Sequence, residues 1–215
     1  MSAATFFQEN WEPDFSCSWE RRVGRPGDGG KWLCDPHKLT QVPECLVYSF
    51  GSKNNFDFED ALHREVGERC DIHSFDHTIG QSPSSTPAFV RFHPWSLGIG
   101  AKARLLNSPL KSLTEIVAQL RHWGRTLHVL KIDVEGAEAD VLPSMLDDGS
   151  FERLKVQQVQ LKIRANNPQK LHRLLRSFRN AGYAIFHKEP DTQLSELSIL
   201  RVEYSFVKLT KAFWQ

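Results

Sequence analysis

The feature that most constrains this chain is a regular alternation, from residue 45 onward, of short apolar runs and amphipathic helical patterns. Short apolar runs that end at glycine, aspartate or His-Pro are typical of strands. We expect strands at 45–50, 70–75, 89–92, 127–132, 156–163 and 183–186, and one long or two short strands over 197–200 and 204–207. Strands that alternate with helices predict an α/β fold, with a mostly parallel sheet and helices on both faces.

Helix signals stand between the predicted strands. Ser112 and Glu115 have the spacing of a capping box, in which each side chain satisfies a free backbone amide of the other. Asn167 is an N-cap candidate, and Pro168 suits the first turn that follows it. Helices are therefore expected over 58–66, from 113 to before Gly124, over about 137–146, and from 168 to before Gly182.

Composition sets outer limits on the protein. The chain has 215 residues, 40% of them hydrophobic, which suffices for one domain with a full core. A net charge of +1 gives no general attraction for nucleic acid or an anionic membrane, so neither is expected as a partner. No stretch approaches the roughly 18 apolar residues of a membrane span. The N-terminus lacks the basic and apolar regions of a signal peptide, so the chain as given predicts a soluble, cytoplasmic protein. A missing leader would make the secretory pathway the alternative.

Residues 1–40 differ in character from the rest. They are rich in turn-forming residues and carry several aromatic side chains, among them Trp11 and Phe15. We expect an irregular leader, 1–40, that packs on a single domain spanning 41–215.

The chain has four cysteines, too few for a disulfide scaffold. Cys17 and Cys34 could pair if the protein is secreted. With His37 and Cys45 they could instead form a zinc site, but no CxxC pair is present and no metal is predicted. Cys45 and Cys70 open apolar runs and are interpreted as small core residues.

The ends of the first two strands carry candidate ligand-binding residues, since parallel sheets bind ligands at the carboxyl ends of their strands. Gly51 and Ser52 follow the first strand, where a glycine permits a tight turn and a close backbone approach. The segment is not a GxGxxG loop, so it suits a ligand without a phosphate there. Asp76 ends the second strand and could accept the hydroxyl hydrogen bonds of a ribose. Ordinary turn and loop roles remain open for each.

The strongest segment is the run from Lys131 to Glu138, Lys-Ile-Asp-Val-Glu-Gly-Ala-Glu. Asp133 and Glu135 alternate along it and would point the same way, toward a cleft at the strand tip. Two neighbouring carboxylates are unfavourable unless they bind a cation or hydrogen-bond donors, or share a proton. A functional role is therefore favoured for both, whereas Glu138 could simply be a charge at a helix N-terminus.

A third candidate segment, Phe-His-Pro-Trp-Ser-Leu-Gly, follows the third strand over residues 92–98. Trp95 could wall a pocket for an adenine-like ring, and His93 could reach inward as a base. Packing alone explains Trp95 as well, and His73, in the middle of a strand, is interpreted as structural.

Taken together, these residues resemble the FkbM-type S-adenosylmethionine-dependent methyltransferases, whose core motif Ile132 to Glu138 reproduces in full. The sequence is most similar to the methyltransferase-like protein 24 subgroup, over about residues 10–208. The segments that carry this similarity are 10–13, 31–37, 47–51, 72–76 and 92–98. The resemblance implies a Rossmann-like, seven-stranded methyltransferase sheet whose last strand is antiparallel.

The resemblance also implies roles for the candidate residues. Gly51, with Ser52, would approach the methionine part of S-adenosylmethionine, Asp76 would hold its ribose, and the loop from His93 to Trp95 would flank its adenine. Asp133 and Glu135 would face the methyl group, and one of these acids or His93 could remove a proton from the acceptor. The implied reaction is O-methylation of a hydroxyl on a small molecule or glycan.

Three departures from the family pattern bear on activity. The first strand ends in Tyr48-Ser-Phe-Gly51 where the family commonly has Asp-Val-Gly-Ala, so the acid is missing, and Asn54 stands where a second glycine is common. Lys162 and Arg164 replace a glutamate and a histidine at the fifth strand. Two alternatives therefore stay open. One is an inactive methyltransferase-fold protein that binds cofactor or a partner. The other is a nicotinamide-dependent oxidoreductase, which the missing GxGxxG opposes.

Overall fold

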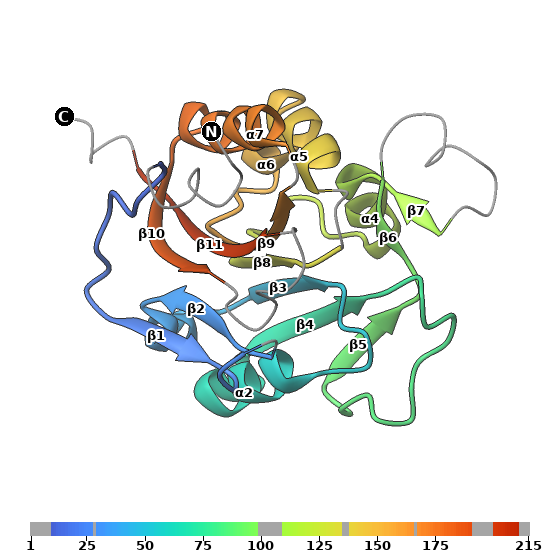
Figure 1. Cartoon of the computed structure of the whole chain (residues 1–215). Helices are drawn as coiled ribbons and strands as arrows, with labels where there is room; N and C mark the ends of the chain where they lie inside the picture. Colours follow the sequence, from blue (N-terminus) through green and yellow to red (C-terminus); the bar gives the residue numbers. More distant parts are fainter. Residues whose placement is uncertain are drawn as a thin grey trace.

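The structure is a computed structural model that describes residues 10–27, 29–98, 109–134, 138–165, 167–190 and 200–210. Its centre is a twisted sheet of seven strands (Figure 1). In chain order these are β3 (Cys45–Phe50), β4 (Cys70–Phe75), β5 (Val90–His93), β8 (Val129–Ile132), β9 (Gln158–Ala165), β10 (Tyr183–Pro190) and β11 (Leu200–Lys208).

The strand order confirms the predicted fold class. The strands lie in the order β10-β11-β9-β8-β3-β4-β5, and β11 runs antiparallel to both of its neighbours while the other pairs are parallel. The chain moves outward from β3 in one direction through β4 and β5, then returns to the other side of β3 with β8. Such a reversal leaves a crevice at the carboxyl ends of the two strands, here β3 and β8.

Helices cover one face of the sheet, and a smaller layer covers the other (Figure 1). On the first face, the larger core joins the sheet to α4 (Leu113–Leu120), α5 (Glu138–Asp147), α6 (Ser150–Arg153) and α7 (Pro168–Asn180). On the second face, the smaller core joins it to α2 (Asp57–Val66) and to a 3-10 helix, η1 (Pro36–Gln41). Within the described ranges, no helix is both long enough and apolar enough to cross a membrane.

Local sequence signals placed the helix starts correctly. The predicted capping box is present, because the Ser112 hydroxyl accepts from the Glu115 amide and the Glu115 carboxylate accepts from the Ser112 amide. The Asn167 side chain caps α7 as expected. The end of α4 was predicted too late: the helix stops at Leu120, where Arg121 adopts a left-handed conformation with φ 59°, short of Gly124.

Part of the segment predicted to be irregular forms a β-hairpin, made of β1 (Glu20–Val23) and β2 (Lys31–Cys34). The hairpin lies against the second face of the sheet. The Gln158 side chain of β9 fixes it there by accepting from the Cys34 amide (2.9 Å) and donating to the Cys34 carbonyl (2.7 Å). Polar residues such as Glu20, Arg21 and Arg22 hide this hairpin from a reading of hydrophobic pattern. A second small pair, β6 (Ser96–Leu97) with β7 (Leu110–Lys111), lies beside β5.

Two disulfides join the four cysteines. Cys17–Cys34 realises one of the two options that the sequence left open and removes the thiolates that a zinc site would need. Cys45–Cys70 corrects the interpretation of these residues as free core cysteines. They are buried, as expected, but the parallel register of β3 and β4 sets them directly opposite one another, with 4.3 Å between their Cα atoms.

We predict that the double substitution Cys45→Ala/Cys70→Ala lowers the free energy of unfolding by about 3 kcal/mol, because the crosslink closes a loop with a sequence separation of 25 residues. Urea unfolding followed by circular dichroism measures this. Cys17→Ala/Cys34→Ala, which removes the other disulfide, is the matched control. A wild-type protein whose stability does not change on addition of a reductant would contradict the prediction.

Candidate functional site

The candidate site begins where β3 ends, at Gly51. This residue has φ +81°, and a Cβ atom placed on it would lie 1.8 Å from the carbonyl oxygen of Asp133. The Gly51 amide donates to the Phe75 carbonyl (2.9 Å), and the Asp133 amide donates to the Phe50 carbonyl (3.0 Å). These bonds hold the ends of β3, β4 and β8 together at a spacing that only glycine allows.

The residues after Gly51 continue the turn. Ser52 is 3% exposed, and its hydroxyl has no hydrogen-bond partner within the described part of the chain. Lys53 and Asn54 both have positive φ, 46° and 64°, so Asn54 adopts the conformation for which the family pattern uses glycine. An unpartnered buried hydroxyl beside a backbone cradle is what a bound polar ligand would satisfy.

A cavity of about 140 Å³ opens at this point. Asp133 lies on its wall, as the sequence predicted. Lys162, which the sequence showed as a departure from the family pattern near the site, also lines it, and so does Lys131, to which the sequence gave no role. The rest of the wall is formed by Gly29, Gly51, Ser52, Lys53, Asn55 and Phe58. Gly29, in the loop between β1 and β2, thus forms the part of the cavity wall that the N-terminal segment contributes.

Lys131 and Ser49 face each other across β3 and β8. The ammonium of Lys131 donates to the Ser49 hydroxyl (3.1 Å) and lies 3.5 Å from the Gly51 carbonyl oxygen. The run that ends β3 lacks the acid of the family pattern, and a cation from β8 lies beside it. The sequence showed that the acid is missing, whereas only the strand register shows the lysine next to this run.

Asp76 lies directly beyond β4 and is 3% exposed. Its carboxylate accepts from the Lys53 amide (2.8 Å), the Thr78 amide (2.9 Å) and the Thr78 hydroxyl (2.6 Å). Asp76 therefore ties the glycine loop to the loop after β4. Each carboxylate oxygen has more than one lone pair, so these bonds leave acceptor capacity for a ligand.

His93 and Trp95 form an aromatic stack at the end of β5. The His93 ring lies 4.9 Å from Phe75 and 4.9 Å from Trp95, centroid to centroid, and the Lys111 ammonium lies 5.1 Å from the Trp95 ring. The backbone carbonyl of His93 accepts from the Asp76 amide (3.0 Å). The structure thus brings the two predicted adenine-flanking residues together beside Asp76.

His93 continues into a row of polar groups that crosses the sheet. Its Nε2 lies 2.9 Å from His73 Nδ1, and His73 Nε2 lies 3.2 Å from Asp71. Burial, reinforced by the positive charges of His73 and His122 when protonated, lowers the pKa of His93 to about 4. His93 is therefore neutral at pH 7, and His73 is held as a structural residue, as expected.

A second buried histidine, His122, joins the same cluster through a 2.6 Å hydrogen bond between its Nδ1 and the Tyr48 hydroxyl. Burial is also the main reason that the pKa of His122 is lowered to about 4. Burial raises the pKa of the Tyr48 hydroxyl above its ordinary value. Both groups are thus neutral over the physiological range.

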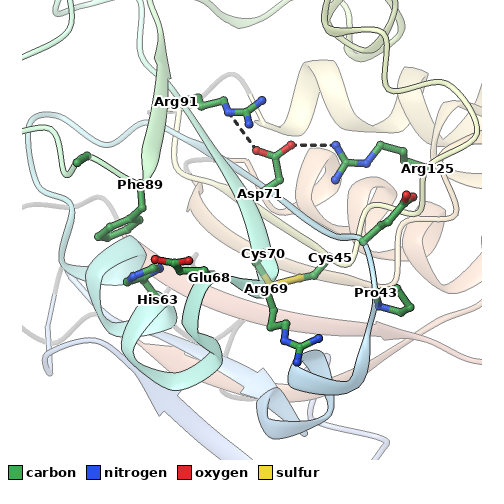
Figure 2. A pocket seen from close by; sticks show the side chains of 12 residues that line it. Pro43, Cys45, His63, Glu68, Arg69, Cys70, Asp71, Phe89, Arg91 and Arg125 are labelled. Carbon is green, nitrogen blue, oxygen red and sulfur yellow. Dashed lines mark hydrogen bonds and ion pairs between the residues drawn. A yellow bond between two sulfur atoms is a disulfide. The ribbon is translucent and has the colours of Figure 1, made fainter.

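The ligand atoms of Asp71, His73 and His122 lie within 4.8 Å of one another, a spacing that could hold a metal. Arg125 (2.9 Å) and Arg91 (3.3 Å) also contact the Asp71 carboxylate, as Figure 2 shows. The hydrogen bond to His73 and the two guanidinium groups hold the pKa of Asp71 well below its usual range. A carboxylate already paired with two cations is a poor ligand for a third.

Larger cavities, of about 660 and 730 Å³, lie at the amino ends of the parallel strands, away from Gly51. Figure 2 shows the first of these, beside the Cys45–Cys70 disulfide. Neither contains a predicted site residue. Glu135 lies outside the described residues, so its predicted position beside Asp133 stays a prediction.

Comparison with known families identifies the class of protein. The sequence profile of a methyltransferase-domain family matches residues 1–208, and the chain belongs to this family. S-adenosylmethionine is the cofactor that this membership implies. The Gly51 cradle, which a Cβ atom would fill, and the unpartnered Ser52 hydroxyl fit such a ligand. No curated protein matches the sequence.

Several solved structures are similar to the chain at low identity. The Methanococcus jannaschii fibrillarin pre-rRNA processing protein has 9% identity and a TM-score of 0.47, with 91% of this chain and 85% of that one covered. A Burkholderia thailandensis 1,6-didemethyltoxoflavin-N1-methyltransferase, solved with S-adenosylhomocysteine, has 10% identity and a TM-score of 0.46, covering 93% and 100%. Similarities at this level carry no information about the acceptor of this chain.

We predict that Gly51→Ala destabilises the protein by about 3 kcal/mol or more, because the new methyl group would overlap the Asp133 carbonyl. Gly124→Ala is the matched control: this turn residue has φ +85°, but no atom lies within 4 Å of its added Cβ, so it should cost only about 1–2 kcal/mol. Equal effects of the two substitutions in thermal unfolding would show that no close contact exists at Gly51.

We predict that acid destabilises the protein through the histidine cluster. The folded pKa values of His93 and His122 lie below the unfolded value, so their neutral burial favours folding above about pH 6.5, and this contribution is lost as pH falls toward 4. His122→Asn should reduce the drop in unfolding free energy between pH 7 and pH 5 by about 1 kcal/mol. The same substitution at exposed His77 is the control. An unchanged pH slope in His122→Asn would refute the prediction.

Proposed function

We propose that this protein is an S-adenosylmethionine-dependent methyltransferase that methylates a hydroxyl group of a small molecule or a glycan. We place it with the FkbM-type enzymes, nearest the methyltransferase-like protein 24 subgroup, because the motif from Ile132 to Glu138 is complete. The observation that carries the proposal is the close approach of Gly51 to Asp133, with the unpartnered Ser52 hydroxyl beside it. Nucleic acid is not proposed as an acceptor, given the net charge of +1.

The proposed cofactor contacts follow the edge of the sheet. Gly51 and Ser52 would hold the methionine part, Asp76 would hold the ribose, and His93 and Trp95 would flank the adenine. The hydrogen bonds that join the Asp76 carboxylate to the glycine loop support this arrangement, because they fix the two loops relative to each other. The stacked rings of Trp95 and His93 support the third contact.

The cofactor supplies an electrophilic methyl group, so the protein's own task is to align the acceptor and remove its proton. Asp133, on the cavity wall, is the proposed base, and Glu135 is its proposed neighbour. His93 is neutral at pH 7 and can accept a proton. However, with a pKa of about 4 and its Nε2 engaged by His73, it is the weaker candidate.

One observation favours a second function, a methyltransferase-fold protein that binds a ligand without transferring a methyl group. Lys162, which replaces an acid of the family pattern, is buried and lines the cavity. A cation at this position could not serve as a base toward an acceptor hydroxyl. The two functions differ in one property: whether a methyl group is transferred to an acceptor.

The two disulfides bear on where the protein folds. Structural disulfides persist in oxidising compartments and are rare in the cytosol. Both crosslinks tie down parts of the fold, the leader through Cys17–Cys34 and the sheet through Cys45–Cys70. We therefore propose the secretory pathway, the alternative compartment, rather than the cytoplasm. Non-reducing mass spectrometry of the protein from its native cells tests this, since four free thiols would contradict it.

We predict that the purified chain binds S-adenosylhomocysteine with micromolar affinity and that Asp76→Ala weakens binding at least tenfold. Calorimetric titration measures both. Asp60→Ala, on α2 and outside the proposed contacts, is the control. Absence of binding to a folded wild-type protein would overturn the proposed function.

Transfer of a labelled methyl group to a panel of hydroxyl-bearing small molecules and glycans separates the two functions. For an active enzyme we expect Asp133→Asn to lower the rate at least a hundredfold while S-adenosylhomocysteine still binds. Cofactor binding without transfer to any acceptor would favour the ligand-binding protein.

A further inference from the structure

Three lysine side chains, one from the hairpin strand β2 and one each from the sheet strands β8 and β9, are buried. Lys31, Lys131 and Lys162 are 1%, 5% and 3% exposed. Lysine is almost never fully buried unless an opposite charge accompanies it, because an ammonium group loses several kcal/mol of hydration free energy on leaving water. Whether each lysine has a carboxylate partner therefore determines whether this region can bind an anion.

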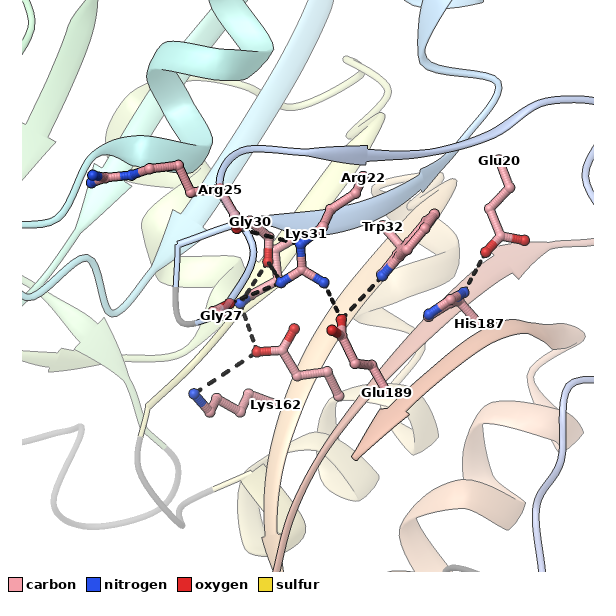
Figure 3. A network of polar contacts seen from close by, with 11 residues as sticks. Glu20, Arg22, Arg25, Gly27, Gly30, Lys31, Trp32, Lys162, His187 and Glu189 are labelled. Carbon is pink, nitrogen blue, oxygen red and sulfur yellow. Dashed lines mark hydrogen bonds and ion pairs between the residues drawn. The ribbon is translucent and has the colours of Figure 1, made fainter. Parts of the chain in front are cut away.

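One carboxylate serves two of the three lysines. Glu203 of β11 lies 2.8 Å from the Lys31 ammonium and 3.8 Å from that of Lys162. Figure 3 shows this contact of Lys162 within the network beneath the hairpin. Two other acids of that network are engaged elsewhere: Glu189 by Arg22 and by the Trp32 indole (3.0 Å), and Glu20 by His187. They are therefore not paired with the lysines.

Lys131 has neutral partners. Its ammonium donates to the Ser49 hydroxyl at 3.1 Å and meets the Gly51 carbonyl at 3.5 Å. Among the described residues, no carboxylate lies within ion-pair distance of it. A buried cation that has only neutral hydrogen-bond partners is favourable only if an anion joins it.

A second buried group next to Lys131 is also unsatisfied. The β8–β9 register sets Gln160 directly beside Lys131, and Gln160 is fully buried. Among the residues that the structure describes, neither the amide nitrogen nor the amide oxygen of Gln160 has a hydrogen-bond partner. Gln160 beside Lys131 and Ser52 on the same cavity as Lys131 therefore both carry unused hydrogen-bonding groups.

A ligand could reach the charge of Lys131 through the cavity. Lys131 and Lys162 both line it, and its volume of about 140 Å³ suits a small group rather than a whole cofactor. The two ammonium groups can donate charge-assisted hydrogen bonds to a carboxylate, and the Ser52 hydroxyl on the same wall can donate another. Asp133, on the same wall, keeps the pocket from being purely cationic.

We propose that Lys131 and Lys162 form a carboxylate-binding site at the carboxyl ends of β8 and β9. The site rests on the proposed function, and its carboxylate has two possible sources. One is the amino-acid end of the cofactor, and the other is an acidic group of the methyl acceptor. The second source would make the acceptor a hydroxyl compound that also carries an acid.

The first experiment titrates two adenosine ligands into the wild-type protein and into Lys131→Met and Lys162→Met. S-adenosylhomocysteine carries the amino-acid carboxylate, whereas 5′-methylthioadenosine lacks it. Methionine keeps the length of the lysine stem. Lys162→Met leaves the Glu203 carboxylate paired with Lys31, so no buried acid loses its last cation. Lys131→Arg restores the charge, and Lys170→Met, at an exposed lysine of α7, is the control.

If the carboxylate belongs to the cofactor, Lys131→Met and Lys162→Met weaken S-adenosylhomocysteine at least tenfold. They leave 5′-methylthioadenosine unchanged, and Lys131→Arg recovers part of the loss. If the carboxylate belongs to the acceptor, all variants bind S-adenosylhomocysteine like the wild type. A second probe then decides.

That probe is malonate, a small dicarboxylate, added at constant ionic strength against chloride. The site predicts that malonate raises the melting temperature of the wild-type and Lys170→Met proteins but not of Lys131→Met or Lys162→Met. Folded variants that match the wild type with both S-adenosylhomocysteine and malonate would overturn the proposal. A wild-type protein that binds neither adenosine ligand would refute the methyltransferase function instead, and the malonate result would still decide on the carboxylate site.

Discussion

The close packing of the Gly51 and Asp133 backbones is the contact on which the rest of the site depends. It joins the ends of β3 and β8, the two strands at which the sheet order reverses. A side chain at position 51 would push these strand ends apart, and with them the Ser52 turn and the cavity beneath it. The crevice of this fold is therefore defined by an absent Cβ atom as much as by the residues that line it.

The two faces of the sheet are covered in different ways. Helices bury one face through apolar contacts. On the other face the hairpin adds Val23 and Leu33 to the smaller core and also makes buried ion pairs and hydrogen bonds, such as that between Lys31 and Glu203. Buried polar contacts are unfavourable unless each group finds a partner. The hairpin therefore brings charge to the edge of the cavity, and this charge distinguishes the site from a neutral cofactor pocket.

Much of the fold could be predicted because its signals are local. The capping box at Ser112 and the cap at Asn167 each depend on residues two or three positions apart. The hairpin and the Cys45–Cys70 disulfide escaped prediction for opposite reasons. The first hairpin strand is polar except for Val23, and the second is only four residues long, so neither shows the alternation of a half-buried strand. The disulfide depends on a register between strands separated by a helix.

By itself, the sequence determined the strand and helix pattern, the glycine turn and the acids at the strand tips, because these follow from residue types at fixed spacing. Tertiary structure alone decided which side chains share the cavity. Lys131 and Lys162 come from separate strands, and Lys31 meets Glu203 across 172 positions of the chain. Charge acts through space rather than along the chain. The charge at the site could therefore be recognised only after β8, β9, β11 and the hairpin were placed side by side.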